Sequence, residues 1–355
     1  MNSTVSAVRG GMAFDVRRLE AWLAANIADF RGPLTVGQFA GGQSNPTYLL
    51  TTPARKYVLR RKPPGVLLPS AHAVDREYRV LAALADTDVP VPRPLALCTD
   101  AAVIGTWFYV MSHVEGRIFW DPKFPDVPRA QRRGYYQAMN QAIASLHRID
   151  FRAVGLGDFG KPTDYLARQI ARWSRQYIED EAAGRVADLD RLIEWLRENT
   201  PAGDEAAIVH GDFRCDNLIF HPTEPRVLAI LDWELATIGH PIADFAYQLM
   251  IYRLPSLAFP GLADVDLTEE GLPSEDEYVE GYCRRTGRDG IANREFYIAF
   301  CIFRLAAIFH GIRGRVIRGT AVGAKAQEYA RQVEALAALG WAQAEQAMRG
   351  PRAHG

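Results

Sequence analysis

Short segments of alternating apolar and polar residues fill the first third of the chain and predict an antiparallel sheet. Glycine, proline and small polar residues separate these segments, as is typical of strands joined by turns. The predicted strands are 34–39, 47–52, 57–61, 95–98 and 107–111. A short amphipathic helix capped by Asp15 precedes them, and a second helix is predicted over 74–85. These elements predict a small N-terminal β lobe.

After Glu115-Gly116 the apolar residues recur every three or four positions, which predicts helices. The predicted helices are 129–147, 163–181, 186–198, 242–251, 275–285, 293–312 and 322–344, and short strands are predicted at 207–209, 218–220 and 227–231. The fold class is therefore α+β with two lobes: an N-terminal lobe over 1–111, a hinge at 112–116, and a larger, mainly helical lobe over 117–355 that would carry catalysis and acceptor binding.

Charge and cysteine content exclude several classes of protein. The 355 residues hold 41 lysines and arginines against 42 aspartates and glutamates, so the net charge of −1 provides no field that would recruit nucleic acid or a membrane surface. The 4 cysteines are scattered, without the spacing of a zinc site or a disulfide framework. No apolar run has the length of a signal peptide or a membrane span. We expect a cytoplasmic globular enzyme without a nucleic-acid or membrane partner, whose oligomeric state the sequence leaves open.

The segment 208–217 runs from an apolar strand into a polar loop that carries the H-x-D-x-x-x-x-N pattern of kinase catalytic loops. Asp212 would accept or orient the proton of a substrate hydroxyl. Asn217, five positions later, offers a neutral oxygen that suits Mg²⁺. His210 is expected to brace the loop.

A second carboxylate, Asp232, follows the continuously apolar strand 227–231. A lone aspartate after a strand serves equally well as a turn or helix cap. Its pairing with the earlier acidic loop favours the functional interpretation, because phosphoryl transfer requires metal ligands as well as a base. Asp232 and Asn217 are therefore the candidate metal ligands.

These motifs resemble those of the aminoglycoside phosphotransferase and choline kinase-like family, which is related to protein kinases. His210-Gly211-Asp212 and Asp232-Trp233-Glu234 have the forms typical of that family, and the resemblance extends from Phe39 to beyond Asp244. It implies a bilobal protein-kinase-like fold, ATP and Mg²⁺ as cofactors, and transfer of the γ-phosphoryl group to a hydroxyl of a small molecule. Within 239–244, Asp244 is expected to brace the catalytic region.

The N-terminal lobe offers candidate contacts to the phosphates. Gly41, Gly42 and Ser44 lie between two predicted strands, where backbone amides could approach phosphate oxygens, although a glycine pair there is also typical of a plain hairpin. Arg60 stands where the kinase pattern has a lysine, and strand alternation places it on the same face as Val58. The alternative is a solvated strand end. Within helix 74–85, Glu77 would orient Arg60, with Asp75 as the second choice.

The segment 107–116 resembles the hinge of the family. The backbone groups of Ser112 and Val114 would then pair with the adenine edge. An ordinary buried strand that ends in a turn explains the same pattern, and the two interpretations are compatible.

The acceptor has several candidates. Residues 62–72 and 74–78 resemble the kinase-like domain attached to some acyl-CoA dehydrogenases, which implies a hydroxyacyl-CoA type of acceptor. The aromatic helix 293–312 with its basic end fits either core packing or a groove for an anionic acceptor. Alternatives are an aminoglycoside, for which 264–270 offers acidic residues, another amino alcohol or sugar, or a non-catalytic nucleotide-binding relative.

Overall fold

The structure is a computed structural model that describes residues 5–40, 45–63, 73–256 and 259–349. Two compact units are distinguished in it. The β unit contains the described residues up to Trp120 together with 152–156 and 215–236, and the helical unit contains 121–151, 157–214 and the chain from Thr237 onward. The β unit thus includes more of the chain than the predicted 1–111 lobe. The reason is that 215–236 folds back onto it, with Ile230 N–H donating to the Pro90 carbonyl at 2.8 Å.

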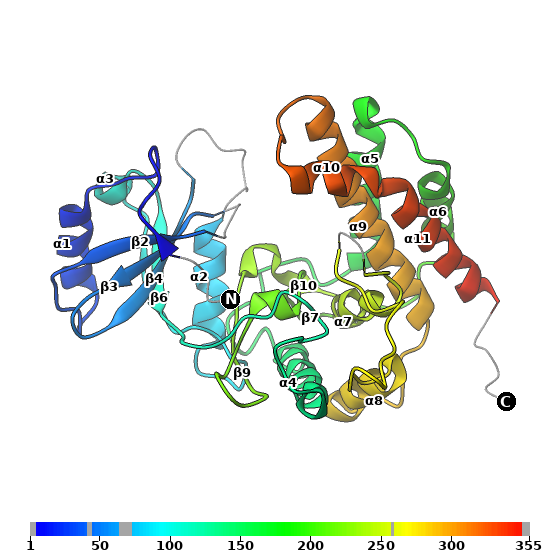
Figure 1. The fold of residues 1–355 in the computed structure, drawn as a ribbon, viewed down its shortest axis with the longest axis horizontal. Helices are drawn as coiled ribbons and strands as arrows, with labels where there is room; N and C mark the ends of the chain where they lie inside the picture. The colour runs from blue at the N-terminus through cyan, green and yellow to red at the C-terminus, as the bar shows by residue number, and fades with distance from the viewer. Residues whose placement is uncertain (1–4, 41–44, 64–72, 257–258, 350–355) are drawn as a thin grey trace. The chain divides into compact units, whose positions relative to one another are not determined.

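The β unit is built on a six-stranded antiparallel sheet in the order β1-β2-β3-β4-β6-β5 (Figure 1). The strands are β1 (Val5–Ser6), β2 (Thr35–Phe39), β3 (Thr47–Thr51), β4 (Lys56–Arg61), β5 (Pro94–Cys98) and β6 (Phe108–Ser112). The sequence predicts all of these except β1, a strand of two exposed residues that shows no alternation to detect.

The two faces of this sheet have different roles. Tyr57 and Leu59 of β4 join the apolar core that Leu19 and Leu23 of α1 (Val16–Asn26) complete. Asp15 caps α1 by accepting from two backbone amides, as the sequence predicts. Because side chains alternate along a strand, Arg60 points to the opposite face. Helix α2 (Val74–Leu84) supplies the partner of Arg60 there.

The returning segment of the β unit is a hairpin. After the short helix α3 (Ala101–Ile104) in the loop before β6, the unit is completed by η2 (Cys215–Asn217), β8 (Leu218–Phe220), β9 (Val227–Ile230) and η3 (Trp233–Leu235). Strands β8 and β9 pair antiparallel. Arg117 and Phe220 exchange backbone hydrogen bonds of 2.8 Å in both directions, which joins the hairpin to the chain after β6.

The helical unit surrounds the 24-residue helix α9 (Arg294–Ile317). The helices packed against α9 are α5 (Tyr165–Glu179), α6 (Ala187–Glu198), α7 (Pro241–Leu249), α10 (Ala324–Arg331) and α11 (Val333–Met348). Of the helices in the described chain, α9 alone is long and apolar enough to cross a membrane, but most of its apolar window is buried in the unit. Its apolar character is therefore explained by core packing.

The remaining elements of the helical unit are α4 (Arg129–His147), η1 (Glu181–Ala183), β7 (Ala207–Val209), β10 (Thr237–Gly239), η4 (Met250–Tyr252) and α8 (Glu275–Thr286). Strand β10, which the sequence does not predict, pairs antiparallel with β7. The single helix predicted over 322–344 is two helices, because Gln332 ends α10 and precedes α11.

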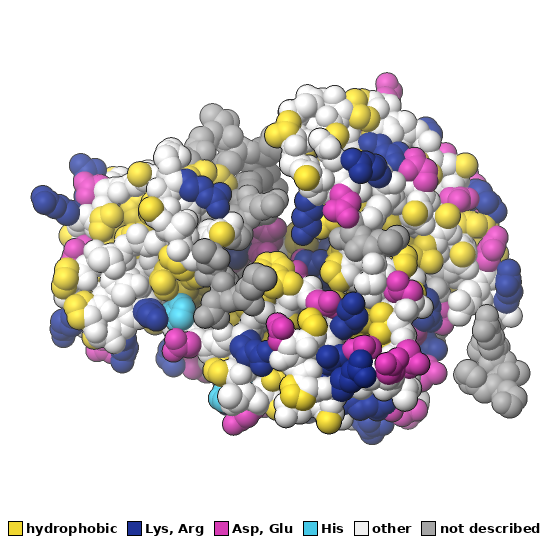
Figure 2. Space-filling view, viewed as in Figure 1, with side chains coloured by type: hydrophobic (Ala, Val, Ile, Leu, Met, Phe, Trp, Pro, Cys, Tyr) yellow, Lys and Arg dark blue, Asp and Glu magenta, His cyan; other side chains and the backbone are white. Residues whose placement is uncertain are grey.

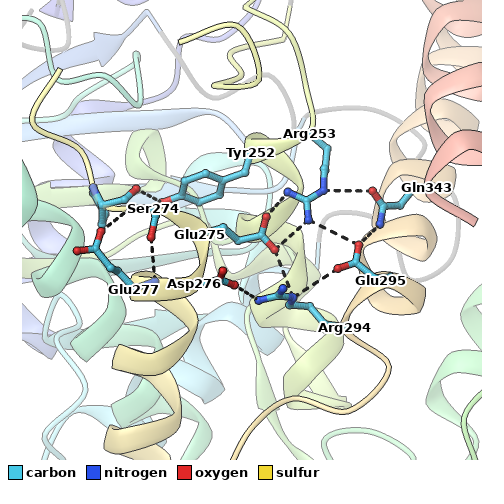
Figure 3. Close-up of polar contacts among 10 residues, drawn as sticks. Tyr252, Arg253, Ser274, Glu275, Asp276, Glu277, Arg294, Glu295 and Gln343 are labelled. Atoms are coloured by element: carbon cyan, nitrogen blue, oxygen red, sulfur yellow. Dashed lines mark hydrogen bonds and ion pairs between the residues drawn. The ribbon is translucent and has the colours of Figure 1, made fainter. Parts of the chain in front are cut away.

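A network of charged side chains ties four elements of the helical unit together (Figure 3). Arg253, directly after η4, contacts Glu275 of α8 at 3.1 Å and Gln343 of α11 at 3.2 Å. Its guanidinium also lies 3.6 Å from Glu295 of α9, which accepts a hydrogen bond from Gln343. Arg294 contacts Glu275 from the other side at 3.4 Å. The charges are thus paired where the ends of these elements meet.

The visible surface carries charge of both signs (Figure 2). Lysine and arginine side chains are interspersed with aspartate and glutamate on the face shown, and apolar side chains lie singly and in small groups among them. This face therefore presents no broad area of one charge.

Candidate phosphoryl-transfer site

The β unit places Arg60 between two carboxylates. Arg60 Nε lies 3.0 Å from Glu77 Oε2, and Arg60 Nη2 donates to Asp232 Oδ1 at 3.0 Å. The pairing of Arg60 with Glu77 is the one that the sequence predicts. Asp75, the second choice, instead lies 3.6 Å from Lys62. Three candidate residues from β4, α2 and the end of β9 thus meet in one cluster.

Two further side chains complete this cluster. Asn45 donates to Glu77 Oε1 at 2.6 Å, and the Tyr109 hydroxyl donates to Glu77 Oε2 at 2.9 Å. Glu77 therefore accepts from three donors, and all of these side chains except Asp232 are buried. Burial by itself lowers the pKa of Arg60, but the carboxylates of Glu77 and Asp232 raise it overall, so the guanidinium stays charged.

Asp232 has an unusual backbone conformation. Its φ of 64° lies in the left-handed region, which residues other than glycine seldom adopt. Such a conformation costs about 1–3 kcal/mol and is most common at functional sites, where surrounding contacts hold it. The side chain is 37% exposed, so the carboxylate can reach both Arg60 and solvent.

Asn217 and Asp232 flank the same end of the β8-β9 hairpin. Leu231 N–H donates to the Asn217 carbonyl at 2.8 Å, and Leu218 pairs with Ile230. Asn217 directly precedes β8 and Asp232 follows β9, so the two candidate metal ligands lie at the same end of the hairpin. In the described part of the chain, no group of three or more His, Cys, Asp and Glu side chains could hold a metal. One carboxylate and one amide oxygen nevertheless fit Mg²⁺, which keeps several waters and takes its other ligands from substrate phosphates.

The proposed adenine contacts lie at the end of β6. Ser112 N–H donates to the Arg93 carbonyl at 2.8 Å, and its hydroxyl accepts from Arg93 N–H at 2.9 Å. Val114 follows in an irregular segment and is half-buried. The Ser112 N–H is therefore engaged with Arg93 within the β unit. Gly41, Gly42 and Ser44 lie outside the described residues.

The catalytic-loop candidate Asp212 belongs to the helical unit, where it follows β7. Its backbone N–H donates to His210 Nδ1 at 3.2 Å, so the histidine braces the loop as the sequence predicts. The carboxylate lies 3.4 Å from Arg214 Nε. The hydroxyl of Tyr247, on α7, also hydrogen-bonds Asp212, and burial together with this carboxylate raises the pKa of Tyr247, which keeps the hydroxyl protonated.

Asp244 holds the backbone of this loop. Its two carboxylate oxygens accept from His210 N–H at 2.7 Å and from Gly211 N–H at 2.8 Å, the bracing role that the sequence predicts. His147 Nε2 lies 3.2 Å from the same carboxylate. Burial works to raise the pKa of Asp244, but His147 and the His210 amide outweigh it and hold this pKa below its usual value.

Four residues that contact these candidates or the glycine before Asp212 are not among the predicted site residues. Tyr109 faces Arg60 across the β4-β6 pair, so the strand register could have revealed it. Asn45 directly follows Ser44 in the sequence and could have been included with that candidate segment. Tyr247 and Arg304 lie on helices far from the loop in sequence, and no local pattern distinguishes them from other core positions.

Comparisons with known proteins show the family to which the chain belongs. The model of the phosphotransferase enzyme family matches residues 35–297. The chain is 45% identical to mouse acyl-CoA dehydrogenase family member 10 over 338 residues, which cover 94% of the chain and 31% of that protein. It spans less than half the length of the curated relatives that it matches.

Solved structures give the same result. A candidate aminoglycoside phosphotransferase from Ralstonia eutropha is 46% identical, with a TM-score of 0.88 over 94% of this chain and 99% of that one. The aminoglycoside phosphotransferase APH(4)-Ia, in a complex with AMP-PNP and hygromycin B, is 15% identical, with a TM-score of 0.55 over 94% of this chain and 99% of that one. The second likeness shows the fold alone. The chain therefore has the α+β protein-kinase-like fold and belongs to the phosphotransferase enzyme family, whose members act on hydroxyl groups of small molecules.

Proposed function

We propose that this phosphotransferase is a kinase that uses Mg²⁺ and ATP and transfers the γ-phosphoryl group to an alcohol. The observation that carries the proposal is the cluster in which Arg60 contacts Glu77 and Asp232 together. Glu77 holds the buried guanidinium of Arg60, while Asp232, the other carboxylate in contact with it, is partly exposed. Arg60 is therefore suited to exchange its contact with Asp232 for a contact with a phosphate. The AMP-PNP held by APH(4)-Ia, which shares the fold, supports nucleotide use.

Each residue has a distinct role in this proposal. Glu77 orients Arg60, and Arg60 donates to the phosphates. Asp232 and Asn217 hold Mg²⁺, which when bound neutralises charge on the phosphates. The backbone of Ser112 and Val114 recognises adenine, and Gly41, Gly42 and Ser44 cover the phosphates. Asp212 accepts the proton of the acceptor hydroxyl, and Tyr247 and Arg214 hold its carboxylate in place.

For the acceptor we propose a hydroxyacyl-CoA. The support is the 45% identity to mouse acyl-CoA dehydrogenase family member 10, a protein named for an acyl-CoA reaction. A second observation concerns charge, because Arg214 lies beside Asp212 and over the ring of Phe259 at 5.2 Å. A cation next to the base favours an anionic acceptor over a polycation.

The acidic residues that would favour an aminoglycoside are engaged within the fold. Glu269 and Glu270 lie 3.7 and 3.3 Å from Arg129. Asp264 accepts from Ser256 N–H at 2.9 Å, and Asp266 accepts from Glu269 N–H at 2.9 Å. These contacts reduce the attraction that the segment could offer to a polycation. We also propose a cytoplasmic location, which is supported by four buried cysteines that are all free thiols.

Thermal unfolding with ATP or GTP, each with and without Mg²⁺, tests nucleotide binding without knowledge of the acceptor. A ligand present at 100 times its Kd stabilises the native state by about 2.7 kcal/mol. We expect an upward shift that requires Mg²⁺ and that Asp232→Asn removes. Asp29→Asn is the matched control, because this exposed aspartate of the β unit only pairs with Arg55 at 3.7 Å. A shift of equal size in both variants would contradict the metal-binding role of Asp232.

Phosphoryl transfer itself is tested with 3-hydroxybutyryl-CoA, 4-hydroxybutyryl-CoA and kanamycin, with ADP release and phosphorylated product as readouts. Asp212→Asn should keep the nucleotide-dependent shift and lose roughly 100-fold or more in kcat, a loss that starts at the lower limit of the range for a general base. Near-wild-type turnover in this variant would exclude Asp212 as the base. If kanamycin is phosphorylated and neither thioester is, the acceptor is an aminoglycoside and the hydroxyacyl-CoA proposal is wrong.

A further inference from the structure

Arg304 of α9 is a buried cation whose contacts are not those of an ordinary ion pair. It is 8% exposed, and no ion pair among the described residues includes it. Its guanidinium lies 5.8 Å from the ring centre of Trp173 and 5.1 Å from that of Tyr247. Its Nε has no hydrogen-bond partner among the residues that the structure describes. A buried charge held mainly by two rings is costly compared with an apolar side chain of similar size. Packing alone therefore does not account for it.

Among the described residues, Arg304 makes one hydrogen bond, and this bond explains its position. Arg304 Nη2 donates to the carbonyl of Gly211 at 2.6 Å. Gly211 directly precedes Asp212, and its φ of 84° is a left-handed value that glycine adopts without strain. This turn directs the chain from β7 toward Asp212. The guanidinium thus contacts the peptide group that links Gly211 to the proposed base.

That peptide group is fixed on both sides. On one side the Gly211 carbonyl accepts from Arg304, and on the other the Asp212 N–H donates to His210 Nδ1. The preceding amide of Gly211 is already held by Asp244. Without Arg304, this planar peptide group would keep one anchor, the hydrogen bond from Asp212 N–H to His210, and the left-handed glycine could adopt other conformations more easily.

Tyr247 connects the same guanidinium to the carboxylate of Asp212. Its ring lies against Arg304, and its hydroxyl hydrogen-bonds Asp212. Tyr247 and Asp244 are three positions apart on α7, so they share one helix face. Helix α7 and Arg304 of α9 therefore hold the backbone and the carboxylate of the base together.

We propose that Arg304 is a positioning residue of the phosphotransferase, which sets the Gly211-Asp212 peptide and, through Tyr247, the Asp212 carboxylate. This rests on the role proposed above for Asp212. A misplaced base affects the chemical step more than nucleotide binding, because the nucleotide contacts come from other residues. Arg304→Met should therefore lower kcat and leave the KM for ATP nearly unchanged.

The control is Arg132 on α4, another buried arginine. It is 6% exposed, donates to the Val127 carbonyl at 3.0 Å and pairs with Glu270. Arg132→Met removes a buried guanidinium from the same unit without touching the catalytic loop. A loss of kcat caused only by reduced stability should appear in both variants, whereas a loss of kcat caused by a displaced catalytic loop should appear only in Arg304→Met.

Two measurements test the proposal on the full-length protein. Hydrogen–deuterium exchange of a peptide spanning 208–214 should be about 10-fold faster in Arg304→Met than in wild type and unchanged in Arg132→Met, because the lost hydrogen bond frees the turn. With Mg²⁺-ATP and the hydroxybutyryl-CoA probes, kcat should fall about 10- to 100-fold with the KM for ATP within about 2-fold. Arg304→Lys can still donate to the Gly211 carbonyl. Compared with Arg304→Met, it should therefore show slower exchange of 208–214 and a higher kcat.

Exchange of 208–214 that is as slow in Arg304→Met as in Arg132→Met overturns the proposal, as does equal turnover in the two variants. The exchange measurement needs no substrate. Absence of turnover in the wild type would therefore count against the proposed function, while the comparison of exchange would still decide the role of Arg304.

Discussion

Arg60 stands where the kinase pattern has a lysine, and its guanidinium contacts two carboxylates of the β unit. A guanidinium presents several donors in a fixed plane, so Arg60 contacts Glu77 and Asp232 with different nitrogens. An ammonium of similar reach is a point charge without this fixed geometry. In the proposed function, Arg60 would keep its link to Glu77 while its contact to Asp232 gives way to a phosphate.

His240 provides a test of protonation at the residue scale. Its Nδ1 accepts from Ile242 N–H at 3.2 Å and so caps α7, while Nε2 lies 3.2 Å from the Tyr297 hydroxyl. Burial lowers the pKa of His240 and outweighs the opposing effect of Glu205. Protonation of Nδ1 would set two N–H groups against each other. The folded state therefore favours the neutral ring.

We predict that His240 makes the protein less stable as the pH falls below about 6.5, the usual pKa of an unfolded histidine. Below this pH the unfolded chain binds a proton that the folded chain does not, with a slope of at most about 1.4 kcal/mol per pH unit for one group. His240→Asn keeps a capping side chain and removes the titration. Urea unfolding at pH 5 to 8 should show the wild type losing its advantage over this variant toward pH 5. Parallel curves would contradict the prediction.

How far the candidate site could be predicted depends on whether a residue follows a local pattern. Strand alternation and the helix after β4 indicate the pair of Arg60 and Glu77, and the loop spacing indicates Asp212. The contacts of Arg304 and Tyr247 with the catalytic loop could not be predicted in this way. They depend on how α7 and α9 pack against β7, which apolar periodicity does not specify.

At the scale of elements, helix boundaries are held by side chains that the apolar pattern does not reveal. Ser274 and Glu277 form a capping box at the start of α8, and Tyr252 donates to the Pro273 carbonyl at 3.2 Å beside it. The charged network of Figure 3 then joins this helix start to α9 and α11. At Gln332 the apolar pattern instead predicts too long a helix. Apolar residues continue at helical spacing across this residue, so the sequence predicts one helix where the structure has α10 and α11. The sequence thus predicts the start of α8 at Glu275 but not the break at Gln332.

Glu275 is the residue of this network whose removal should cost most. Its side chain is only 10% exposed and contacts both Arg253 and Arg294. Glu275→Ala should lower the free energy of unfolding by about 2–3 kcal/mol, because two partly buried arginines lose a shared acceptor while Glu295 and Asp276 still pair with them. The midpoint of urea unfolding measures this change.

Glu280 on the same helix is the control for this prediction. It is 69% exposed and pairs with Arg284 one turn later, so Glu280→Ala should change stability by less than about 0.5 kcal/mol. Unfolding of the two variants at the same urea concentration would show that the network of Figure 3 contributes no more than a surface pair.

At the scale of the whole molecule, the two compact units do not correspond to two continuous halves of the chain. The metal-binding candidates follow the catalytic-loop residue Asp212 in sequence but belong to the β unit. The hairpin that carries them is joined to it at several points. Phe119 and Phe220 stack edge to face at 5.2 Å, and Asp232 contacts Arg60 at 3.0 Å. The apolar pattern identifies the strands of this hairpin. It does not indicate that 215–236 packs with the β unit while the chain on either side belongs to the helical unit.

A fragment of residues 1–120 should therefore lack both the stability and the nucleotide response of the full chain. It retains the six strands but loses the backbone hydrogen bonds to the hairpin and the carboxylate of Asp232. We expect no Mg²⁺-ATP-dependent rise in its thermal midpoint. A peptide of residues 215–236 added in trans should raise that midpoint by restoring the hairpin contacts, because binding to the native state stabilises it.

The same peptide with Asp232→Asn separates the two contributions of the hairpin. It keeps Phe220 and the backbone of β8 and β9, so it should still raise the midpoint of the fragment without nucleotide. It lacks the carboxylate beside Arg60, so it should not restore the response to Mg²⁺-ATP. A fragment that responds to Mg²⁺-ATP without any peptide would show that residues 1–120 bind nucleotide alone. In that case neither Asp232 nor Asn217 would be required for nucleotide binding.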